Sequence, residues 1–511
     1  MATISTIATP AACESGFVLP AATIAGTPVR ARGAEDTQDT RGDAHRATPI
    51  FNASTGATIG WQEHANAALV DEAVRAAHTA LASWRTTAPA KRGKLLKKIA
   101  ELIDADRARL ASMQMLVSGK PPLEADIDVS DAAATFNYYA DLCLDAKAFA
   151  PEALALPDDT VTGERFYEAV GVAALIVPWN FPMVTTAWKI APALAAGCTV
   201  VLKPSELTSP VEHMLAEIIN EAGVPDSVVN LVNGGGEVGA LLTAHPLVDK
   251  ISFTGSTASG KKVMQAAAQD MKRVTLELGG KSALIVRADA DVERAVSLAV
   301  GGAFTNAGQM CSATARILVH DDVYRKFMAA FETAVRAIVV GPSQNTHVNP
   351  NATMGPLVCA AQRTRVQALV EQGLRAGASV AFLGSVDHAC GDGFFMAPMV
   401  IAEPPTDNLL WTDEIFGPVA CVKSFRTDEE AIALANDTRY GLVATVVTAD
   451  REAARRYKTQ LRAGLVWINT PQLIFPQACW GGLGLSGTGR ELGLAGLRSY
   501  QELRHAIADV G

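Results

Sequence analysis

The chain has 511 residues, of which 49% are hydrophobic and 19% are charged, and its formal net charge is −9. This length exceeds what one hydrophobic core normally supports, so we expect two or three domains. The acidic balance argues against a nucleic-acid-binding protein, whose contact face should be basic, and no apolar run reaches the roughly 18 residues that a membrane span needs.

The cysteines argue for a reducing compartment. There are eight, they are widely scattered, and they form no C-x-x-C pair, which excludes the usual zinc spacing and a disulfide framework. We therefore expect no metal site and a cytoplasmic location, since residues 1–20 also lack the basic start and apolar core of a secretory signal. Residues 30–48, rich in Gly, Asp, Arg and Thr, are typical of a solvated loop or a disordered insertion.

The pattern of apolar residues predicts helices in the first part of the chain. Apolar side chains recur at helical spacing between Asn66 and Ser118, and a second helical region runs from Ala125 to Phe149. We interpret both regions as covering helices with a structural role.

From Gly171 onward, short apolar runs alternate with amphipathic helices. This alternation predicts a mostly parallel sheet with helices on both faces. One helix is marked by a capping box from Ser209 to Glu212, with Pro210 at its first position, and by Gly223 at its end. The apolar runs are 172–177, 199–202, 228–232, 250–253 and 273–277.

Polar and glycine-rich segments follow these runs, where the ligands of an open parallel sheet bind. Glu206 can accept the hydroxyls of an adenosine ribose and repel a 2′-phosphate, and the helix that Ser256 opens can receive a pyrophosphate. Any one of these residues could simply satisfy a turn, but together they favour a nucleotide site. The segments are Pro178–Pro182, Lys203–Glu206, Phe253–Ser256 and Glu277–Lys281.

Residues Gly234–Gly239 match the pattern G-x-G-x-x-G. The dinucleotide-binding motif belongs to the first strand of its unit, whereas this match follows the third apolar run. We therefore interpret it as a tight turn between a strand and a helix, near an adenine pocket, with no role in pyrophosphate binding.

Cys311 lies within a segment of small residues, Phe304–Ala315, that follows a second βα region beginning at 283–286. Such a backbone can approach a substrate and offer N–H groups to an oxyanion, and a partly ionised thiol can attack a carbonyl carbon. The alternative is an inert buried cysteine, which is the common fate of a free thiol.

The motifs of this chain, in the order in which they occur, resemble those of the NAD(P)-dependent aldehyde dehydrogenase superfamily over essentially the whole chain. The separation of 34 residues between Glu277 and Cys311 (311 − 277) is also typical of that family. The matching motifs are Pro178-Trp-Asn-Phe-Pro, Lys203-Pro-Ser-Glu, Phe253-Thr-Gly-Ser, Leu276-Glu-Leu-Gly-Gly-Lys, Gly308-Gln-Met-Cys, Glu414-Ile-Phe-Gly-Pro and Gly489-Arg-Glu-Leu-Gly.

The resemblance implies an α/β fold with two doubly wound parallel-sheet domains and a small β oligomerisation element. It places an NAD-binding domain at residues 1–149 and 168–278 and a catalytic domain at 279–495. Residues 150–167 and 496–511 become the oligomerisation element, which implies a homodimer or homotetramer. The implied cofactor is NAD and the implied substrate is a small-molecule aldehyde.

Roles follow residue by residue from the same resemblance. It implies Cys311 as nucleophile, Asn180 as oxyanion donor and Glu277 as general base, with Glu491 as a carboxylate linked to a proton path. The expected NAD contacts are Trp179, Lys203, Glu206, Gly255, Ser256, Glu414 and Phe416. The expected lining of the aldehyde tunnel is Phe181, Trp188, Met310, Ile474 and Trp480.

These residue types suit an oxidation that passes through a thioester. A thiohemiacetal oxyanion on Cys311 needs preorganised donors, each worth about 3–4 kcal/mol, and the later hydrolysis needs a carboxylate with a raised pKa to activate water. CoA-acylating relatives typically lack the glutamate at position 277, so its presence favours release of a free carboxylic acid.

The aromatic residues of the tunnel predict a cationic substrate, because aromatic faces attract desolvated cations by about 1–2 kcal/mol. Residues 309–315 and 475–482 look most like the betaine-aldehyde and aminoaldehyde subgroup. Thr305 stands where many of that subgroup carry tryptophan, and Cys479 replaces a usual proline, so a broad-range dehydrogenase for aliphatic or aromatic aldehydes is the alternative. The sequence has no arginine beside Cys311 that would favour a semialdehyde with a carboxylate group.

Two further alternatives concern the class of activity. A retired binding or structural protein of the same fold would have no physical need to retain Cys311, Glu277 and Asn180 together. Esterase activity at the same thiol would be a side reaction that needs no NAD.

Overall fold

The computed structural model describes residues 16–30, 47–342, 351–386 and 390–510. Most of residues 1–20, which lack the features of a secretory signal, lie outside the described residues, and so do residues 31–46 of the predicted loop. Thr48, which was assigned to that loop, instead belongs to a strand.

Among the described residues, the first large sheet has eight strands in the order β20-β12-β11-β8-β9-β10-β2-β3. The five central strands are parallel and coincide with the five predicted apolar runs, whereas β2, β3 and β20 add antiparallel edges. The strands are β2 (Ala22–Ile24), β3 (Thr27–Val29), β8 (Val172–Ile176), β9 (Thr199–Lys203), β10 (Val229–Val232), β11 (Lys250–Thr254), β12 (Arg273–Glu277) and β20 (Gly487–Thr488).

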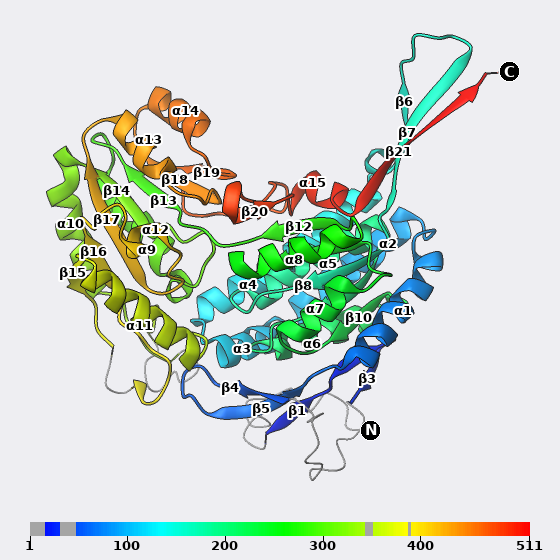
Figure 1. Ribbon diagram of the computed structural model, residues 1–511, viewed down its shortest axis with the longest axis horizontal. Helices are drawn as coiled ribbons and strands as arrows, with labels where there is room; N and C mark the ends of the chain where they lie inside the picture. The colour runs from blue at the N-terminus through cyan, green and yellow to red at the C-terminus, as the bar shows by residue number, and fades with distance from the viewer. Residues whose placement is uncertain (1–15, 31–46, 343–350, 387–389, 511) are drawn as a thin grey trace.

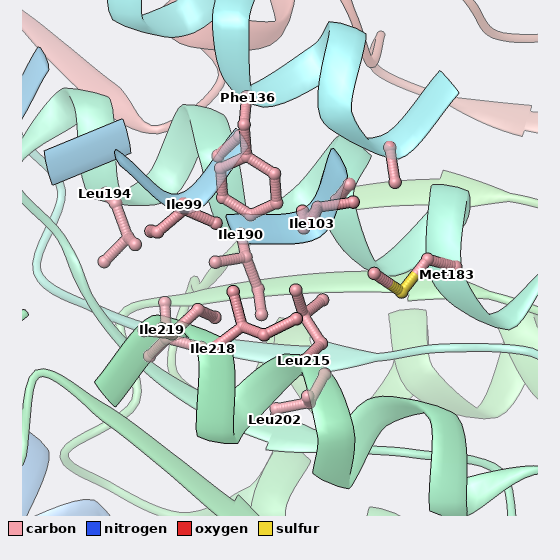
Figure 2. Packing of buried hydrophobic residues seen from close by; sticks show 14 of the residues in the cluster. Ile99, Ile103, Phe136, Met183, Ile190, Leu194, Leu202, Leu215, Ile218 and Ile219 are labelled. Atoms are coloured by element: carbon pink, nitrogen blue, oxygen red, sulfur yellow. The ribbon is translucent and has the colours of Figure 1, made fainter. Parts of the chain in front are cut away.

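Helices cover this sheet (Figure 1), as the βα alternation predicts. Figure 2 shows hydrophobic side chains of α2, α4, α5 and α6 packed together with Leu202 of β9, so the helices predicted before residue 150 do contribute to the core. The helices are α1 (Ala67–Trp84), α2 (Pro89–Ala105), α3 (Arg107–Ser118), α4 (Pro122–Leu144), α5 (Pro182–Ala196), α6 (Ser209–Glu221), α7 (Gly236–Ala244) and α8 (Thr257–Gln269).

The second large sheet has seven strands within the described ranges, in the order β15-β16-β17-β14-β13-β18-β19. The strands from β16 to β19 in this order are parallel, and β15 is an antiparallel edge. The strands are β13 (Ala283–Val286), β14 (Arg316–His320), β15 (Ser379–Leu383), β16 (Met399–Ala402), β17 (Val419–Phe425), β18 (Val443–Val447) and β19 (Leu465–Ile468).

The helices around the second sheet enclose a separate hydrophobic core. Each follows a strand or a connecting loop of this part of the chain, which agrees with a second α/β unit. The helices are α9 (Val292–Phe304), α10 (Asp321–Arg336), α11 (Ala360–Arg375), α12 (Leu409–Thr412), α13 (Asp428–Asn436) and α14 (Arg451–Gln460). A further helix, α15 (Gly493–Arg498), instead packs against α5, and its Leu497 belongs to the core of the first sheet.

Two small sheets complete the fold. The first pairs β1 (Phe17–Leu19) with β5 (Thr58–Glu63) and β4 (Ala47–Phe51). The second joins β6 (Glu152–Leu154), β7 (Val161–Ala169) and β21 (Gln501–Asp509), and Figure 1 shows this sheet extending away from the body as an arm.

The structure tests two predicted features of the first sheet, the start of α6 and the turn before α7. The helix predicted after residue 208 is present, but its N-cap is Thr208, and no side chain supplies a capping hydrogen bond. Ser209 is therefore the first helical residue, and the predicted capping box is wrong by one position. The G-x-G-x-x-G match forms a tight connection between β10 and α7, as expected.

No helix within the described ranges combines the length and the apolar character needed to cross a lipid bilayer.

Candidate active site

A cavity of about 980 Å³ lies at the ends of strands of both large sheets. Fourteen of the sixteen site residues predicted from the sequence line it. The two that do not are Lys203 and Glu206, which lie together at the end of β9. The structure thus brings the motifs of distant segments to one place.

The segment before Cys311 has an unusual backbone. Asn306 and Ala307 both have φ of 52°, and Gly308 has φ of 72°, a left-handed conformation that costs free energy for residues other than glycine. A Cβ at Gly308 would collide with the Gly417 carbonyl oxygen. This constrained turn directs the chain into Cys311.

Hydrogen bonds from other elements hold this turn. The backbone N–H of Asn306 donates to both carboxylate oxygens of Glu124 on α4, at 3.0 and 3.1 Å. The side-chain amide of Asn306 donates to the backbone oxygen of Asn180 at 2.9 Å. Burial raises the pKa of Glu124 to about 7. The loop that carries the thiol is therefore fixed against α4 and against the Asn180 segment.

Asn180 is buried on the other side of the thiol loop. Its amide Nδ2 donates one hydrogen bond to the Gln309 carbonyl oxygen at 2.9 Å. The Gln309 side chain in turn accepts a hydrogen bond from the backbone of Val358 at 3.0 Å. Since a primary amide carries two N–H groups, Asn180 keeps a second donor while the first fixes its orientation.

Glu277 is the last residue of β12 and is only 3% exposed. Neither of its carboxylate oxygens has a hydrogen-bond partner among the described residues. Burial raises the pKa of Glu277 well above its usual range, and the nearby charge of Glu491 raises it further. A Cβ at Gly481 would come within 2.8 Å of Glu277 Oε1, so a glycine there leaves room for the carboxyl group.

The Cys311 thiol is half-buried at the cavity wall. Burial raises its pKa above the ordinary value, and the carboxylates of Glu414 and Glu277 raise the pKa further. In the protein alone, the thiol is therefore protonated at neutral pH, and an attack by Cys311 needs a proton acceptor or a compensating positive charge.

Glu491 belongs to a buried polar network behind Glu277. Its Oε1 forms an ion pair with Lys189 of α5 and accepts a hydrogen bond from Ser252 of β11 at 3.1 Å. Its backbone exchanges two hydrogen bonds with Trp480, at 2.7 and 2.8 Å. Glu491 thus links the buried polar network behind Glu277 to Trp480 of the aromatic wall.

The side of the cavity expected to bind the cofactor is lined by a carboxyl group and two aromatic rings. Glu414 accepts a hydrogen bond from the Gly280 N–H at 3.0 Å, and burial raises its pKa to about 7. The rings of Phe416 and Trp179 meet edge to face, with centroids 5.2 Å apart. Phe416 has φ of 58°, which marks another constrained position beside the cavity.

The four remaining residues expected to bind the cofactor lie at strand ends of the first sheet. Ser256 caps α8 by accepting a hydrogen bond from the Ser259 N–H at 3.2 Å, and Gly255 precedes it. Lys203 is buried, which lowers its pKa, and its Nζ lies 3.8 Å from Glu206.

The side of the cavity expected to bind the aldehyde is aromatic. The ring of Trp480 packs against Trp188 at 5.4 Å and against Trp467 at 6.2 Å between centroids. The Phe181 ring differs, because the ammonium of buried Lys120 already lies 4.1 Å from its centroid. One face of Phe181 is therefore occupied by a cation of the protein itself.

The sequence analysis missed several residues of the cavity wall. Asp128 and Asp131 of α4 line it, so the purely structural role given to that helix is incomplete. Asp128 forms a buried ion pair with Lys120 at 2.8 Å, whereas Asp131 has no ion pair with any described residue. Burial together with the Asp128 charge raises the pKa of Asp131 to about 6. The spacing of Asp128 and Asp131, three residues apart on a helix, was the sequence feature that could have indicated a shared acidic face.

Comparison with known proteins agrees with this geometry. The family model described as "Aldehyde dehydrogenase family" matches residues 40–506. Aminoaldehyde dehydrogenase 2, peroxisomal, of Pisum sativum is 42% identical over 90% of this chain and 92% of its own length. Betaine aldehyde dehydrogenase 1 of Oryza sativa subsp. japonica is 43% identical over 90% and 91% of the two chains.

Comparison with solved structures indicates the same family. The crystal structure of betaine aldehyde dehydrogenase from Staphylococcus aureus in complex with NAD⁺ superposes with a TM-score of 0.90, at 35% identity over 96% of this chain and 94% of that chain. The chain belongs to the aldehyde dehydrogenase family, and the predicted fold class is confirmed. It is an enzyme that oxidises aldehydes.

Proposed function

We propose that this enzyme oxidises a cationic aldehyde, either betaine aldehyde or an aminoaldehyde, to the free carboxylic acid with NAD. The observation that carries the proposal is the single cavity that contains the Cys311 thiol, the Asn180 amide and the unpartnered Glu277 carboxyl beside the packed tryptophans. The names of the relatives support the same substrate class.

The residues present suit NAD. A Cβ at Gly279 would collide with Glu414, so the backbone there leaves open the space beside the Glu414 carboxyl group, where a ribose hydroxyl can be accepted. Lys203 and Glu206 would hold the adenosine ribose, and the Glu206 carboxylate favours NAD over NADP by repelling a 2′-phosphate. Bound NAD supplies the hydride acceptor and a positively charged ring.

Cys311 starts the reaction by adding its sulfur to the aldehyde carbon, and its proton passes to a basic group or to solvent. The oxyanion that forms is stabilised by the Asn180 amide and by the Cys311 backbone N–H, each contributing about 3–4 kcal/mol. Because a hydrogen bond to Gln309 fixes the Asn180 side chain, this donor needs no reorganisation as the negative charge develops.

Glu277 acts in the second half of the reaction, once the aldehyde carbon is held as a thioester on Cys311. Its raised pKa suits a general base, since burial makes its charged form readily accept a proton from water. The hydroxide then attacks the thioester carbon and the thiolate leaves, which releases the acid. Glu491 and Lys189 lie behind Glu277 and are suited to pass the proton onward.

Two features support a cationic substrate. The packed rings of Trp188 and Trp480 offer aromatic faces, and Asp131 provides a carboxylate without an ion pair on the same cavity wall. The alternative, a broad-range dehydrogenase for neutral aldehydes, is favoured by Lys120, which occupies one face of Phe181 and neutralises Asp128.

The arm formed by β6, β7 and β21 supports a homodimer or homotetramer. Leu503 and Ile507 on β21 are 47% and 65% exposed, and an exposed apolar strand at a sheet edge is suited to pair with a second copy. We assign NAD binding to the first large sheet, catalysis to the second and assembly to this arm. A cytoplasmic location rests on the scattered free cysteines.

The test is kcat/KM with NAD for betaine aldehyde, 3-aminopropanal and a neutral aldehyde of similar size. We expect the cations to be preferred by about tenfold, which corresponds to about 1.4 kcal/mol of transition-state discrimination. Equal or better turnover of the neutral aldehyde would support the broad-range alternative. Similar kcat/KM values for NAD and NADP would contradict the role given to Glu206.

A further inference from the structure

One face of helix α9 lines the cavity in addition to the residues used above. The members of this face recur at intervals of three and four, so they lie on one side of the helix, while the opposite side packs into the core of the second sheet. We call this face the α9 wall, and its residues are Arg294, Ser297, Leu298, Gly301 and Gly302, together with Thr305 directly after the helix.

The α9 wall leaves open space in the cavity. A Cβ at Gly301 would meet no atom within 4 Å, although a glycine inside a helix is less stable than an alanine. Gly302 differs, because a Cβ there would collide with Thr314 Oγ1. Packing therefore requires a glycine at 302 but not at 301, and Gly301 widens the cavity.

A buried polar group of β18, elsewhere on the wall of the same cavity, also indicates a ligand. Thr445 of β18 is 2% exposed and lines the cavity, and its hydroxyl has no hydrogen-bond partner in the described part of the chain. A buried polar group left without a partner is unfavourable, and a hydrogen bond from a ligand would remove that cost. Gln472 Oε1 is a second buried acceptor without a partner in that same part, while its Nε2 donates to the Ser312 carbonyl oxygen at 3.1 Å.

The cavity carries opposite charges on two helices. Arg294 at the start of the α9 wall donates to the Asn469 carbonyl oxygen but forms no ion pair with any described residue. Asp131 on α4 likewise has a carboxylate without an ion pair among those residues. A ligand that bears one positive and one negative group would match both helices.

We infer that the α9 wall is a second substrate arm, which binds the carboxylate-bearing tail of an aminoaldehyde whose nitrogen carries a carboxyalkyl group. The secondary ammonium of such a substrate lies toward Asp131, its carboxylate toward Arg294, and Thr445 and Gln472 provide polar contacts along the tail. This inference rests on the proposed function, because the aldehyde end must still reach Cys311.

Three aldehydes test the arm: 3-aminopropanal, N-butyl-3-aminopropanal and N-(3-carboxypropyl)-3-aminopropanal. The two substituted compounds have similar lengths, so their comparison isolates the carboxylate. We expect the carboxypropyl compound to exceed the butyl compound in kcat/KM by about fivefold or more, and R294Q to remove that difference. An unchanged ratio in R294Q would overturn the inference.

The size of the arm is tested with Gly301→Phe, and Gly301→Ala is the matched control. Both changes replace a helical glycine whose Cβ position is open, so neither should impair folding. We expect the phenylalanine to lower kcat/KM for both substituted aldehydes by about tenfold while leaving 3-aminopropanal within about twofold. The alanine variant should leave all three within about twofold.

An equal loss for all three aldehydes in Gly301→Phe would overturn the arm. Failure of the proposed function gives a different result, in which the unsubstituted enzyme produces no NADH from any of the three compounds. If it oxidises 3-aminopropanal but neither substituted compound, only the arm is wrong.

Discussion

The Cys311 end of the cavity and its α9 wall are built in different ways. Around Cys311, constrained backbone and hydrogen bonds from distant elements fix the thiol loop and the Asn180 amide, as in the left-handed turn at Asn306 that Glu124 holds. The α9 wall is an ordinary helix face that ends in small side chains. Chemistry thus depends on a few fixed atoms, whereas substrate choice depends on the space and charge that a helix surface leaves.

The largest effect should come from the nucleophile. We expect Cys311→Ala to lower kcat/KM by about 10⁴-fold or more, because no other group can form the thioester. Steady-state NADH production measures this loss. The matched control is Cys359→Ala, a half-buried cysteine that does not line the cavity, and it should keep its activity. Normal turnover by the Cys311 variant would contradict the mechanism.

Glu277 gives the next largest effect, and the expected defect lies in one step. Glu277→Gln should lower kcat by about 10²–10³-fold, because water is no longer activated against the thioester. The first turnover should still occur, so rapid mixing should show a burst of about one NADH per active site followed by a slow phase. Loss of the burst together with the steady state would place Glu277 in the first step instead.

Asn180 tests the fixed oxyanion donor. Asn180→Ala should lower kcat by about 10²-fold, in keeping with the loss of one preorganised donor. Thermal unfolding should accompany the kinetics, since the same amide holds the Gln309 carbonyl. A variant with normal kcat and a lower Tm would show that Asn180 serves only the loop.

The smallest effect should come from the wall. The pKa of Asp131 is raised to about 6, so its carboxylate is charged above that pH and neutral below it. For a cationic aldehyde, kcat/KM should therefore fall by about three- to fivefold as the pH drops through 6, relative to a neutral aldehyde of similar size. Asp131→Asn should remove this difference, and its persistence in the variant would assign the titration to another group.

The sequence predicted the catalytic end of the cavity better than its walls. Residues such as Asn180 and Glu277 follow apolar strands in recognisable motifs, so their meeting at one sheet edge follows from the βα order. Asp131 and Gly301 lie inside helices whose apolar periodicity explains the helix but not what its polar face meets. That meeting depends on how the two sheets pack together, which local patterns do not contain.

The sequence also could not predict which residues adopt a strained backbone or which buried side chains contact one another. The positive φ of Phe416 and the cover of Phe181 by Lys120 arise from tertiary contacts, and both change how a matched motif acts. The N-cap at Thr208 shows the same limit on a small scale, since the sequence offered Ser209 as an equally good capping residue.

The most direct test of the account is intact-protein mass spectrometry of Glu277→Gln after mixing with NAD and 3-aminopropanal. The account predicts a mass increase equal to one acyl group, located on Cys311 by peptide mapping and absent when NAD is omitted. An unmodified Cys311 under conditions that produce NADH, or an acyl group on another residue, would contradict a thioester that Cys311 forms and Glu277 resolves.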